Sequence, residues 1–154
     1  MTRDVSIDIR RLGPGQAQAV AAAGRLFDDV PLEDATRAFL ADPARHLLVA
    51  YAAGERPVGF ASGIELTHPD KGTEMLLYEL GVDEPLRRRG IGRRLVAALE
   101  ALACERGCYG MYVLVDDDNK AAVATYASAG GHVTSRPLMI DWKLGRRDPG
   151  KRPE

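Results

Sequence analysis

A run of arginines and glycines near the middle of the chain constrains the fold more than any other feature. A strand-like run, 74–82, precedes it, and an amphipathic run, 91–106, follows it. Glycines remove side chains from a turn, so successive backbone N–H groups can converge on one anion, and a helix that begins there adds the positive end of its dipole. The residues concerned are Arg87, Arg88, Arg89, Gly90, Gly92, Arg93 and Arg94. The pattern predicts a strand, an anion-binding loop and a helix; a solvated basic face at a helix start is the plainer alternative.

The spacing of these glycines excludes two nucleotide-binding motifs. A P-loop requires Gly-x-x-x-x-Gly-Lys-Ser/Thr, which does not occur in the chain. A dinucleotide fingerprint requires Gly-x-Gly-x-x-Gly near the start of a βαβ unit, but Leu95 occupies the third glycine position. What remains, Arg87-x-x-Gly90-x-Gly92, resembles the acyl-CoA pyrophosphate loop of the GNAT superfamily of N-acetyltransferases.

A second motif follows in the order that this superfamily shows. Residues 119–130 resemble its Asn-x-x-Ala-x-x-x-Tyr-x-x-x-Gly run, with Gly131 where the family usually has Phe or Tyr. The resemblance extends over about residues 5–144. Within the superfamily, the pieces 77–82, 88–91 and 112–113 look most like the small aminoglycoside 3-N-acetyltransferases.

The resemblance implies a mixed α+β fold, in which a mostly antiparallel central sheet is flanked by helices. Its fourth and fifth strands are splayed, and CoA enters between them. The hydrophobic periodicity of the chain predicts the elements. The expected strands are 6–10, 46–53, 57–66, 74–82 and 109–115, with closing strands 132–134 and 138–144; the expected helices are 14–27, 32–40, 91–106 and 119–129. We expect one domain over residues 1–144 and a loose tail over 145–154.

Composition restricts the partners. The chain has 21 Lys and Arg against 22 Asp and Glu, which argues against nucleic-acid binding and leaves the clustered arginines to serve a local anion. No leader-like segment opens the chain and no window approaches a membrane span, so we expect a cytoplasmic protein without membrane contact. Cys104 and Cys108 lie four apart and the three histidines are scattered, so no metal site is expected. The sequence leaves open whether the chain forms a homodimer.

The resemblance implies acetyl-CoA as cosubstrate. By position in the two motifs and the preceding strand, ten residues are expected to bind it: Leu80, Val82, Arg87, Arg88, Arg89, Gly90, Ile91, Gly92, Arg93 and Asn119. The backbone N–H of Val82 would stabilise the oxyanion. Asn119 has a second interpretation, because asparagine after three aspartates is also an ordinary helix cap.

The chemistry requires a base, because alkyl amines are protonated at pH 7. Glu79 is the candidate, since strand alternation places it with Leu77 on one face and Tyr78 with Leu80 on the other. A carboxylate within an apolar strand invites a raised pKa; an exposed strand residue or an arginine partner is the alternative. Tyr126 resembles the position that protonates the leaving thiolate, although a tyrosine at that helical spacing also suits a core.

Three aspartates, Asp116, Asp117 and Asp118, follow the fifth expected strand. They suit either an acidic rim for a cationic acceptor or a solvated loop before a helix. The aminoglycoside enzymes have an acidic pair before a proline here, and only Asp116 is matched.

Together these patterns predict an N-acetyltransferase that moves acetyl from acetyl-CoA directly, in a ternary complex, to a primary amine of a small cationic acceptor. The 3-amino group of an aminoglycoside is the first candidate. A peptide or protein amine, or a non-catalytic acyl-CoA-binding sensor, are the alternatives.

Overall fold

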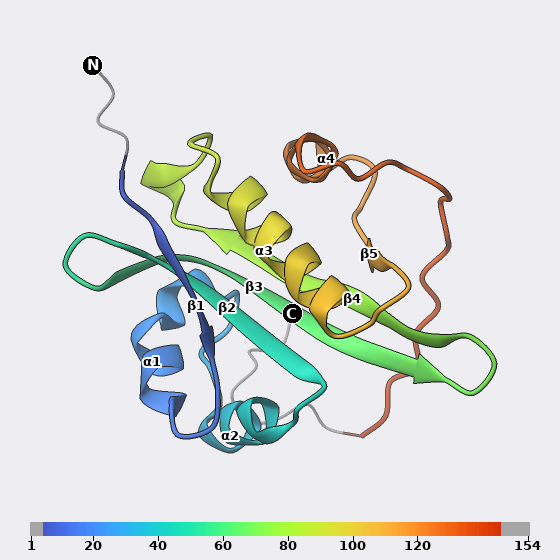
Figure 1. Cartoon of the computed structure of the whole chain (residues 1–154), viewed down its shortest axis with the longest axis horizontal. Helices are drawn as coiled ribbons and strands as arrows, with labels where there is room; N and C mark the ends of the chain where they lie inside the picture. The colour runs from blue at the N-terminus through green and yellow to red at the C-terminus, as the bar shows by residue number, and fades with distance from the viewer. Residues whose placement is uncertain (1–4, 146–154) are drawn as a thin grey trace.

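The computed structural model describes residues 5–145, which form a mixed α+β fold around one five-stranded sheet (Figure 1). The strands are β1 (Asp8–Leu12), β2 (Arg45–Ala52), β3 (Arg56–His68), β4 (Gly72–Val82) and β5 (Met111–Val113), and they lie in that order in the sheet. The first four pair in antiparallel fashion, and β5 pairs with β4 in parallel. The expected fold class is confirmed.

Helices lie on both faces of the sheet, with α1 and α2 on one side and α3 on the other, and α4 beside α3 (Figure 1). Their bounds are α1 (Ala17–Ala22), the 3-10 helix η1 (Gly24–Leu26), α2 (Glu33–Ala41), the 3-10 helix η2 (Glu84–Leu86), α3 (Ile91–Glu105) and α4 (Lys120–Ser128). The single helix expected over 14–27 is therefore two short elements. The expected helices 32–40, 91–106 and 119–129 are confirmed within two residues.

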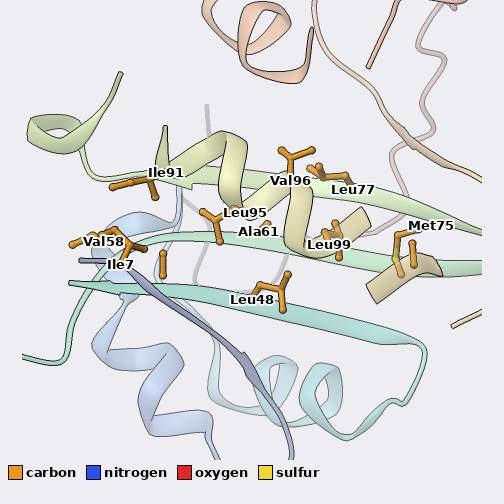
Figure 2. Packing of buried hydrophobic residues seen from close by; sticks show 12 residues of the cluster. Ile7, Leu48, Val58, Ala61, Met75, Leu77, Ile91, Leu95, Val96 and Leu99 are labelled. Carbon is orange, nitrogen blue, oxygen red and sulfur yellow. The ribbon is translucent and has the colours of Figure 1, made fainter. Parts of the chain in front are cut away.

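The main core lies between α3 and the sheet. Ile91, Leu95 and Leu99 recur every four residues and are at most 3% exposed, so they form one apolar stripe along α3. Figure 2 shows this stripe together with Met75 and Leu77 of β4, which belong to the same cluster. The helix stops where Gly107 adopts the expected left-handed conformation, with φ 77°.

The hairpin between β3 and β4 is longer than the sequence suggested. The expected strands 57–66 and 74–82 leave the polar residues 67–73 outside the sheet, but the ladder continues to the pair His68 and Gly72. The hydroxyls of Thr67 and Thr73 lie 2.8 Å apart across the two strands, and this cross-strand contact supports the extra pairs. The polar residues 67–73 thus form the exposed end of a hairpin and not an irregular loop.

The expected splay between the fourth and fifth strands is present. β5 pairs with β4 only over three positions, Met75 to Leu77 against Met111 to Val113. It is shorter than the expected strand 109–115, and the rest of β4 has no β5 partner. The sheet is therefore open at the carboxyl half of β4.

The two closing strands expected over 132–134 and 138–144 are not formed. We call residues 132–144 the C-terminal arm; all of them are exposed and none is in a ladder. A strand requires a neighbour for its backbone groups, and β5 does not reach the arm. Of the expected tail, only Gly145 is described, and 146–154 lie outside the described residues. No helix within residues 5–145 is both long and apolar enough to cross a membrane.

Candidate functional site

A bulge in β4 determines which way Glu79 points. Ser62 of β3 pairs with Glu79, but the next residue, Gly63, pairs with Leu77, so Tyr78 is an extra residue on β4. The extra residue reverses the alternation beyond it. Leu77 and Leu80 consequently pack on the same core below α3, whereas Glu79 faces the other side. The expected sharing of one face by Glu79 and Leu77 is wrong.

A side-chain hydroxyl supports the bulge. The backbone N–H of Glu79 donates a hydrogen bond to Ser62 Oγ over 3.1 Å. Ser62 is 6% exposed, so its hydroxyl makes this hydrogen bond in surroundings that are largely shielded from solvent. This contact orients the strand at the residue that carries the carboxylate.

Glu79 lines a cavity of about 510 Å³ between the carboxyl end of β4 and the segment that contains η1. That volume is within the range of small-molecule sites, ~300–1,000 Å³. Four acidic residues and two arginines line it: Asp28, Glu79, Asp83, Glu84, Arg25 and Arg87. Acidic side chains therefore outnumber basic ones in its wall, and this favours a cationic occupant.

An ion cluster joins the cavity wall to the sheet. Asp83 Oδ2 accepts hydrogen bonds from Arg56 Nη2 at 2.5 Å and Arg25 Nη2 at 3.1 Å. These two guanidinium groups hold the pKa of the Asp83 carboxyl below its usual range. Arg25 also donates to the carbonyl of Pro57 at 2.7 Å. The η1 segment is thereby fixed against β3 and β4.

The N–H of Val82 points toward the open side of β4. The N–H groups of Glu79 and Asp83 both point to β3, donating to Ser62 Oγ and to the Val58 carbonyl. Because successive N–H groups of a strand point to opposite edges, that of Val82 points away from β3. It is therefore aimed at the gap where β5 has diverged, as the expected oxyanion role requires.

The loop after η2 has the backbone geometry of an anion site. Gly90 adopts φ 80° and Arg88 adopts φ 63°, and alternating left-handed residues turn neighbouring N–H groups toward one point. Gly90 is the N-cap of α3 and has no side chain with which to cap it. The first N–H groups of a 15-residue helix are thus available to a ligand.

The arginines of this loop differ in their contacts. Arg87 Nε donates to the Val82 carbonyl at 3.1 Å, and Arg94 Nη2 donates to the Ile7 carbonyl at 2.9 Å. Arg88, Arg89 and Arg93 are exposed, and within the described residues no ion pair involves them. These three side chains carry the positive field around the loop.

Gly92 serves packing as well as the loop. A Cβ added there would lie 3.1 Å from Cγ2 of Thr125 on α4. At Gly90 an added Cβ would meet nothing within 4 Å. The two glycines of the motif therefore have different structural roles. Gly92 permits the close approach of α3 and α4, and Gly90 permits the turn.

Asn119 caps α4. Its side-chain oxygen accepts a hydrogen bond from the N–H of Ala122 at 3.1 Å, which is the usual N-cap geometry. The structure therefore shows Asn119 as a helix cap, which was its second interpretation from the sequence. A contact with CoA stays a prediction, and it would have to come from the amide nitrogen.

Tyr126 lies on α4, half-buried against the core below α3. Burial raises the pKa of its phenol, so the hydroxyl stays protonated, as an acid must. The helix ends just beyond it: Gly130 adopts φ 97°, and the N–H of Gly131 donates to the Tyr126 carbonyl at 3.0 Å. A Cβ at residue 131 would lie 3.1 Å from that carbonyl oxygen, so glycine suits this helix end better than the family's aromatic residue.

The three aspartates after β5 are exposed and do not line the cavity. Asp117 pairs with Arg136 of the C-terminal arm at 3.2 Å. They therefore lie outside the cavity that Glu79 lines, and a role in acceptor binding stays a prediction. Sequence reasoning missed the acidic residues that do share the cavity, because Asp28 lies more than fifty positions from Glu79 and only the fold brings it there.

Among residues 5–145, no group of three His, Cys, Asp or Glu side chains is placed to hold a metal ion. Cys104 is exposed and Cys108 is half-buried, and both are reduced.

Comparison with known protein families gives one match, to the sequence profile of the acetyltransferase (GNAT) family, over residues 18–130. Two curated relatives are similar over shorter stretches. N-alpha-acetyltransferase RimI of Mycobacterium tuberculosis is 40% identical over 91 residues, 59% of this chain and 54% of the relative. Acetyltransferase SG1711 of Sodalis glossinidius is 30% identical over 97 residues, 63% of this chain and 64% of the relative. The chain thus spans between half and two thirds of these relatives.

Solved structures share the fold over nearly their whole length. An aminoglycoside acetyltransferase, meta-AAC0020 from an uncultured soil metagenomic sample, superposes with a TM-score of 0.82 at 21% identity, covering 90% of this chain and 97% of that one. The aminoglycoside N-acetyltransferase AAC(6')-Iy, solved with CoA, superposes with a TM-score of 0.76 at 21% identity, covering 94% and 99%. At these identities the likeness concerns the fold.

Proposed function

Because the chain belongs to the acetyltransferase (GNAT) family, we propose that it transfers an acetyl group from acetyl-CoA to a primary amine of a small cationic acceptor. One observation carries the proposal. A cavity with four acidic residues in its wall meets the open edge of β4, beside the loop at the start of α3. One end of this arrangement suits an anionic cofactor and the other a cation.

The cofactor end is the loop 87–92. The pyrophosphate of acetyl-CoA would accept hydrogen bonds from the first N–H groups of α3, with Arg88, Arg89 and Arg93 around it. The rest of the cofactor would follow the unpaired edge of β4 past Leu80 and Val82. Related folds have been solved with CoA, including AAC(6')-Iy, which supports this assignment.

Transfer proceeds directly between the two bound substrates. The amine nitrogen attacks the thioester carbonyl, and the N–H of Val82 stabilises the oxyanion that forms. Glu79 takes the proton that the amine loses, directly or through a water in the cavity. The C–S bond then breaks, and Tyr126 protonates the leaving thiolate. An acceptor that enters as an ammonium ion loses two protons on the way to the amide. Glu79 takes the first, which frees the lone pair for attack, and passes it to solvent; the second restores the phenol of Tyr126 after the phenol has protonated the thiolate.

An aminoglycoside is the first acceptor to test. It is small and polycationic, as the acidic cavity requires, and meta-AAC0020 has been solved with sisomicin. The pieces of sequence around β4 favour its 3-amino group, whereas AAC(6')-Iy is named for the 6' position. NMR of the acetylated product would identify the amino group modified.

A peptide amine is the second candidate, favoured by the 40% identical match to an N-alpha-acetyltransferase. A panel assay decides between the candidates. Release of CoA thiol from acetyl-CoA is measured with aminoglycosides, linear polyamines, peptides with free N-termini and neutral amines. We expect the highest kcat/KM with a polycation. Preference for a neutral peptide would move the proposal to the second candidate, and tight CoA binding without turnover on any amine would indicate an acyl-CoA sensor.

A further inference from the structure

Arg25 is a cation in the wall of a cavity that suits a cationic acceptor. It lines the cavity beside four acidic side chains, and an uncompensated guanidinium there would repel an ammonium group. Its charge is compensated, because its Nη2 lies 3.1 Å from Asp83 Oδ2. The same nitrogen donates a hydrogen bond to the Pro57 carbonyl at 2.7 Å. One side chain thus ties the cavity wall both to the end of β4 and to β3.

Arg25 belongs to residues 24–28, the η1 segment, which is held to the sheet on two sides. On the core side, Phe27 stacks on Phe60 of β3 with the ring centroids 4.1 Å apart. On the cavity side, the polar contacts of Arg25 provide the attachment. Asp28, one of the acidic residues of the wall, lies in the same segment. The place of its carboxylate therefore depends on how the segment is docked.

The η1 segment approaches β4 closely at Gly81. A Cβ added at this residue would lie 3.0 Å from the carbonyl oxygen of Leu26 and 2.6 Å from Phe60 Cε1. All three residues line the cavity, so the docked segment leaves no space for a larger residue at position 81. Gly81 directly precedes Val82, whose N–H is the proposed oxyanion donor. The acceptor wall is thus positioned against the stretch of β4 at which the thioester would react.

Asp83 has a second partner that is not part of the cavity wall. Arg56 Nη2 lies 2.5 Å from the same Oδ2, and Arg56 does not line the cavity. The Asp83 side chain is 16% exposed, against 46% for Arg25 and 55% for Arg56, so two accessible arginines neutralise one shielded carboxylate. Loss of either arginine changes the charge around Asp83 equally. Only the loss of Arg25 also removes an attachment of the η1 segment.

We propose that Arg25, docked on Asp83, is a positioning residue for the acceptor. It acts through the η1 segment, whose placement fixes Asp28 in the acidic wall, and it makes no contact with the reacting amine. The inference rests on the proposed function, because it requires a cationic acceptor in this cavity. The pair also cancels one positive and one negative charge of the wall, so the acidic excess that the acceptor meets comes from the other side chains.

Charge alone predicts the opposite effect of removing Arg25. Loss of its guanidinium leaves the cavity wall more negative, and a more negative wall attracts a polycation more strongly. The KM for the acceptor would then fall. If Arg25 acts through the placement of the η1 segment, the wall loses its shape and the KM rises. The direction of the change in KM therefore separates the two roles.

Steady-state kinetics with an aminoglycoside as acceptor tests the proposal with a matched pair of variants. Arg25→Met and Arg56→Met each remove one guanidinium from Asp83. We expect Arg25→Met to raise the acceptor KM about tenfold, as the loss of a charge-assisted hydrogen bond allows, with an unchanged Kd for acetyl-CoA. Arg56→Met should leave this KM near that of the wild type. Arg25→Lys should restore it in part, because one ammonium nitrogen can donate to both acceptors.

The possible outcomes distinguish this inference from the proposed function. A KM that is unchanged or lower in Arg25→Met, or that rises equally in both methionine variants, overturns the inference alone. A wild type that acetylates no polycation refutes the proposed function and the inference together.

Hydrogen exchange tests the docking without any acceptor. The N–H groups of Leu26 and Phe27 donate to the carbonyls of Ala23 and Gly24, so their exchange with deuterium, followed by NMR, reports opening of the η1 segment. We expect faster exchange in Arg25→Met and unchanged exchange in Arg56→Met. Equal exchange in Arg25→Met and the wild type overturns the proposal, because the segment would then stay docked without Arg25.

Discussion

The backbone N–H of Glu79 lies 3.1 Å from Ser62 Oγ and donates a hydrogen bond to it. The contact crosses from β4 to β3 at the bulge, and its acceptor is the hydroxyl of a serine. A side chain outside the cavity wall thus supports the position of the proposed base.

Ser62→Ala removes this acceptor. The N–H of Glu79 then loses its hydrogen bond to the serine hydroxyl, which contributes on the order of 0.5–1.5 kcal/mol to the free energy of unfolding. We expect kcat to fall as Glu79 loses its position, while the Kd for acetyl-CoA, measured by calorimetry, stays unchanged. Ser62→Thr keeps the hydroxyl and is the control. Equal kcat in Ser62→Ala and the wild type would show that the hydrogen bond does not position the base.

Glu79→Gln keeps the size of the side chain and removes its basicity. We expect kcat to fall by about 10²–10⁴, the usual contribution of a general base. A general base works only when it is ionised, so the wild-type rate should depend on the ionisation of Glu79. The rate of the variant should lack this dependence. The check is a pH profile of kcat/KM. A profile and rate identical to the wild type would assign proton removal to another group or to water.

Tyr126→Phe removes only a hydroxyl from a half-buried side chain. If Tyr126 protonates the thiolate, kcat falls by about 10² or more with little change in CoA affinity. Burial raises the pKa of this phenol, so the acid form persists over the whole range in which the enzyme is assayed. If kcat is retained, Tyr126 is a packing residue of α4, which is the alternative that its helical spacing suggested.

The two glycines of the anion loop should respond differently to substitution. Gly90→Asn tolerates the left-handed backbone, yet its side chain fills the space of the pyrophosphate. We expect acetyl-CoA affinity to weaken at least about tenfold, or 1.4 kcal/mol, with little loss of stability. Gly92→Ala should lower the melting temperature more, because the new Cβ lies 3.1 Å from Thr125 Cγ2. Unchanged CoA affinity in Gly90→Asn would contradict the loop assignment.

Two acidic groups compete for the role of acceptor site, and a pair of double variants separates them. Asp28→Asn with Glu84→Gln neutralises the cavity wall, whereas Asp116→Asn with Asp117→Asn neutralises the loop after β5. Each exposed charge contributes only ~0.2–1 kcal/mol, so several-fold increases in KM for a polycation are expected. We expect the larger increase from the cavity pair.

The wild-type KM for the same acceptor should rise with salt, since attraction between exposed charges is screened within about 10 Å at 0.1 M. A larger effect of the Asp116 and Asp117 pair would restore the sequence hypothesis of an acidic rim there.

His46 makes stability depend on pH. It is fully buried, its Nε2 lies 3.0 Å from Glu65 Oε1, and its Nδ1 has no hydrogen-bond partner within the described residues. Burial lowers the pKa of His46, so the folded state favours the neutral ring. The resulting stability is present above the unfolded pKa, near 6.5, and is lost as pH falls through the lower folded value. Urea unfolding at pH 7 and 5 should show a decline that is smaller in His46→Gln.

The sequence predicted a helix or strand correctly where the residues that determine it lie close together in the chain. The stripe of Ile91, Leu95 and Leu99, and the stop at Gly107, depend on neighbours within a few turns. The splay of β4 from β5 followed from the family resemblance, and the structure confirms it.

What the sequence missed depends on distant partners. Nothing in the order Leu77-Tyr78-Glu79-Leu80 marks an extra residue, because the bulge exists only relative to β3. The ion cluster of Asp83 with Arg25 and Arg56 joins three separate segments. For the C-terminal arm, the alternation predicted strands over 132–134 and 138–144 that the structure does not form, because a strand also requires a neighbour for its backbone groups.

The bulge at Tyr78 has a consequence for how such a protein can evolve. Before it, Met75 and Leu77 face the core; after it, Glu79 faces the cavity while Leu80 returns to the core. A substitution at Glu79 can therefore alter the acceptor without disturbing the neighbours of α3. If residues 77–80 paired in regular alternation, without the bulge, Glu79 would share the face of Leu77 and place a carboxylate against apolar side chains. New specificities can thus arise by point mutation at Glu79, as long as the bulge that turns this residue toward the cavity is kept.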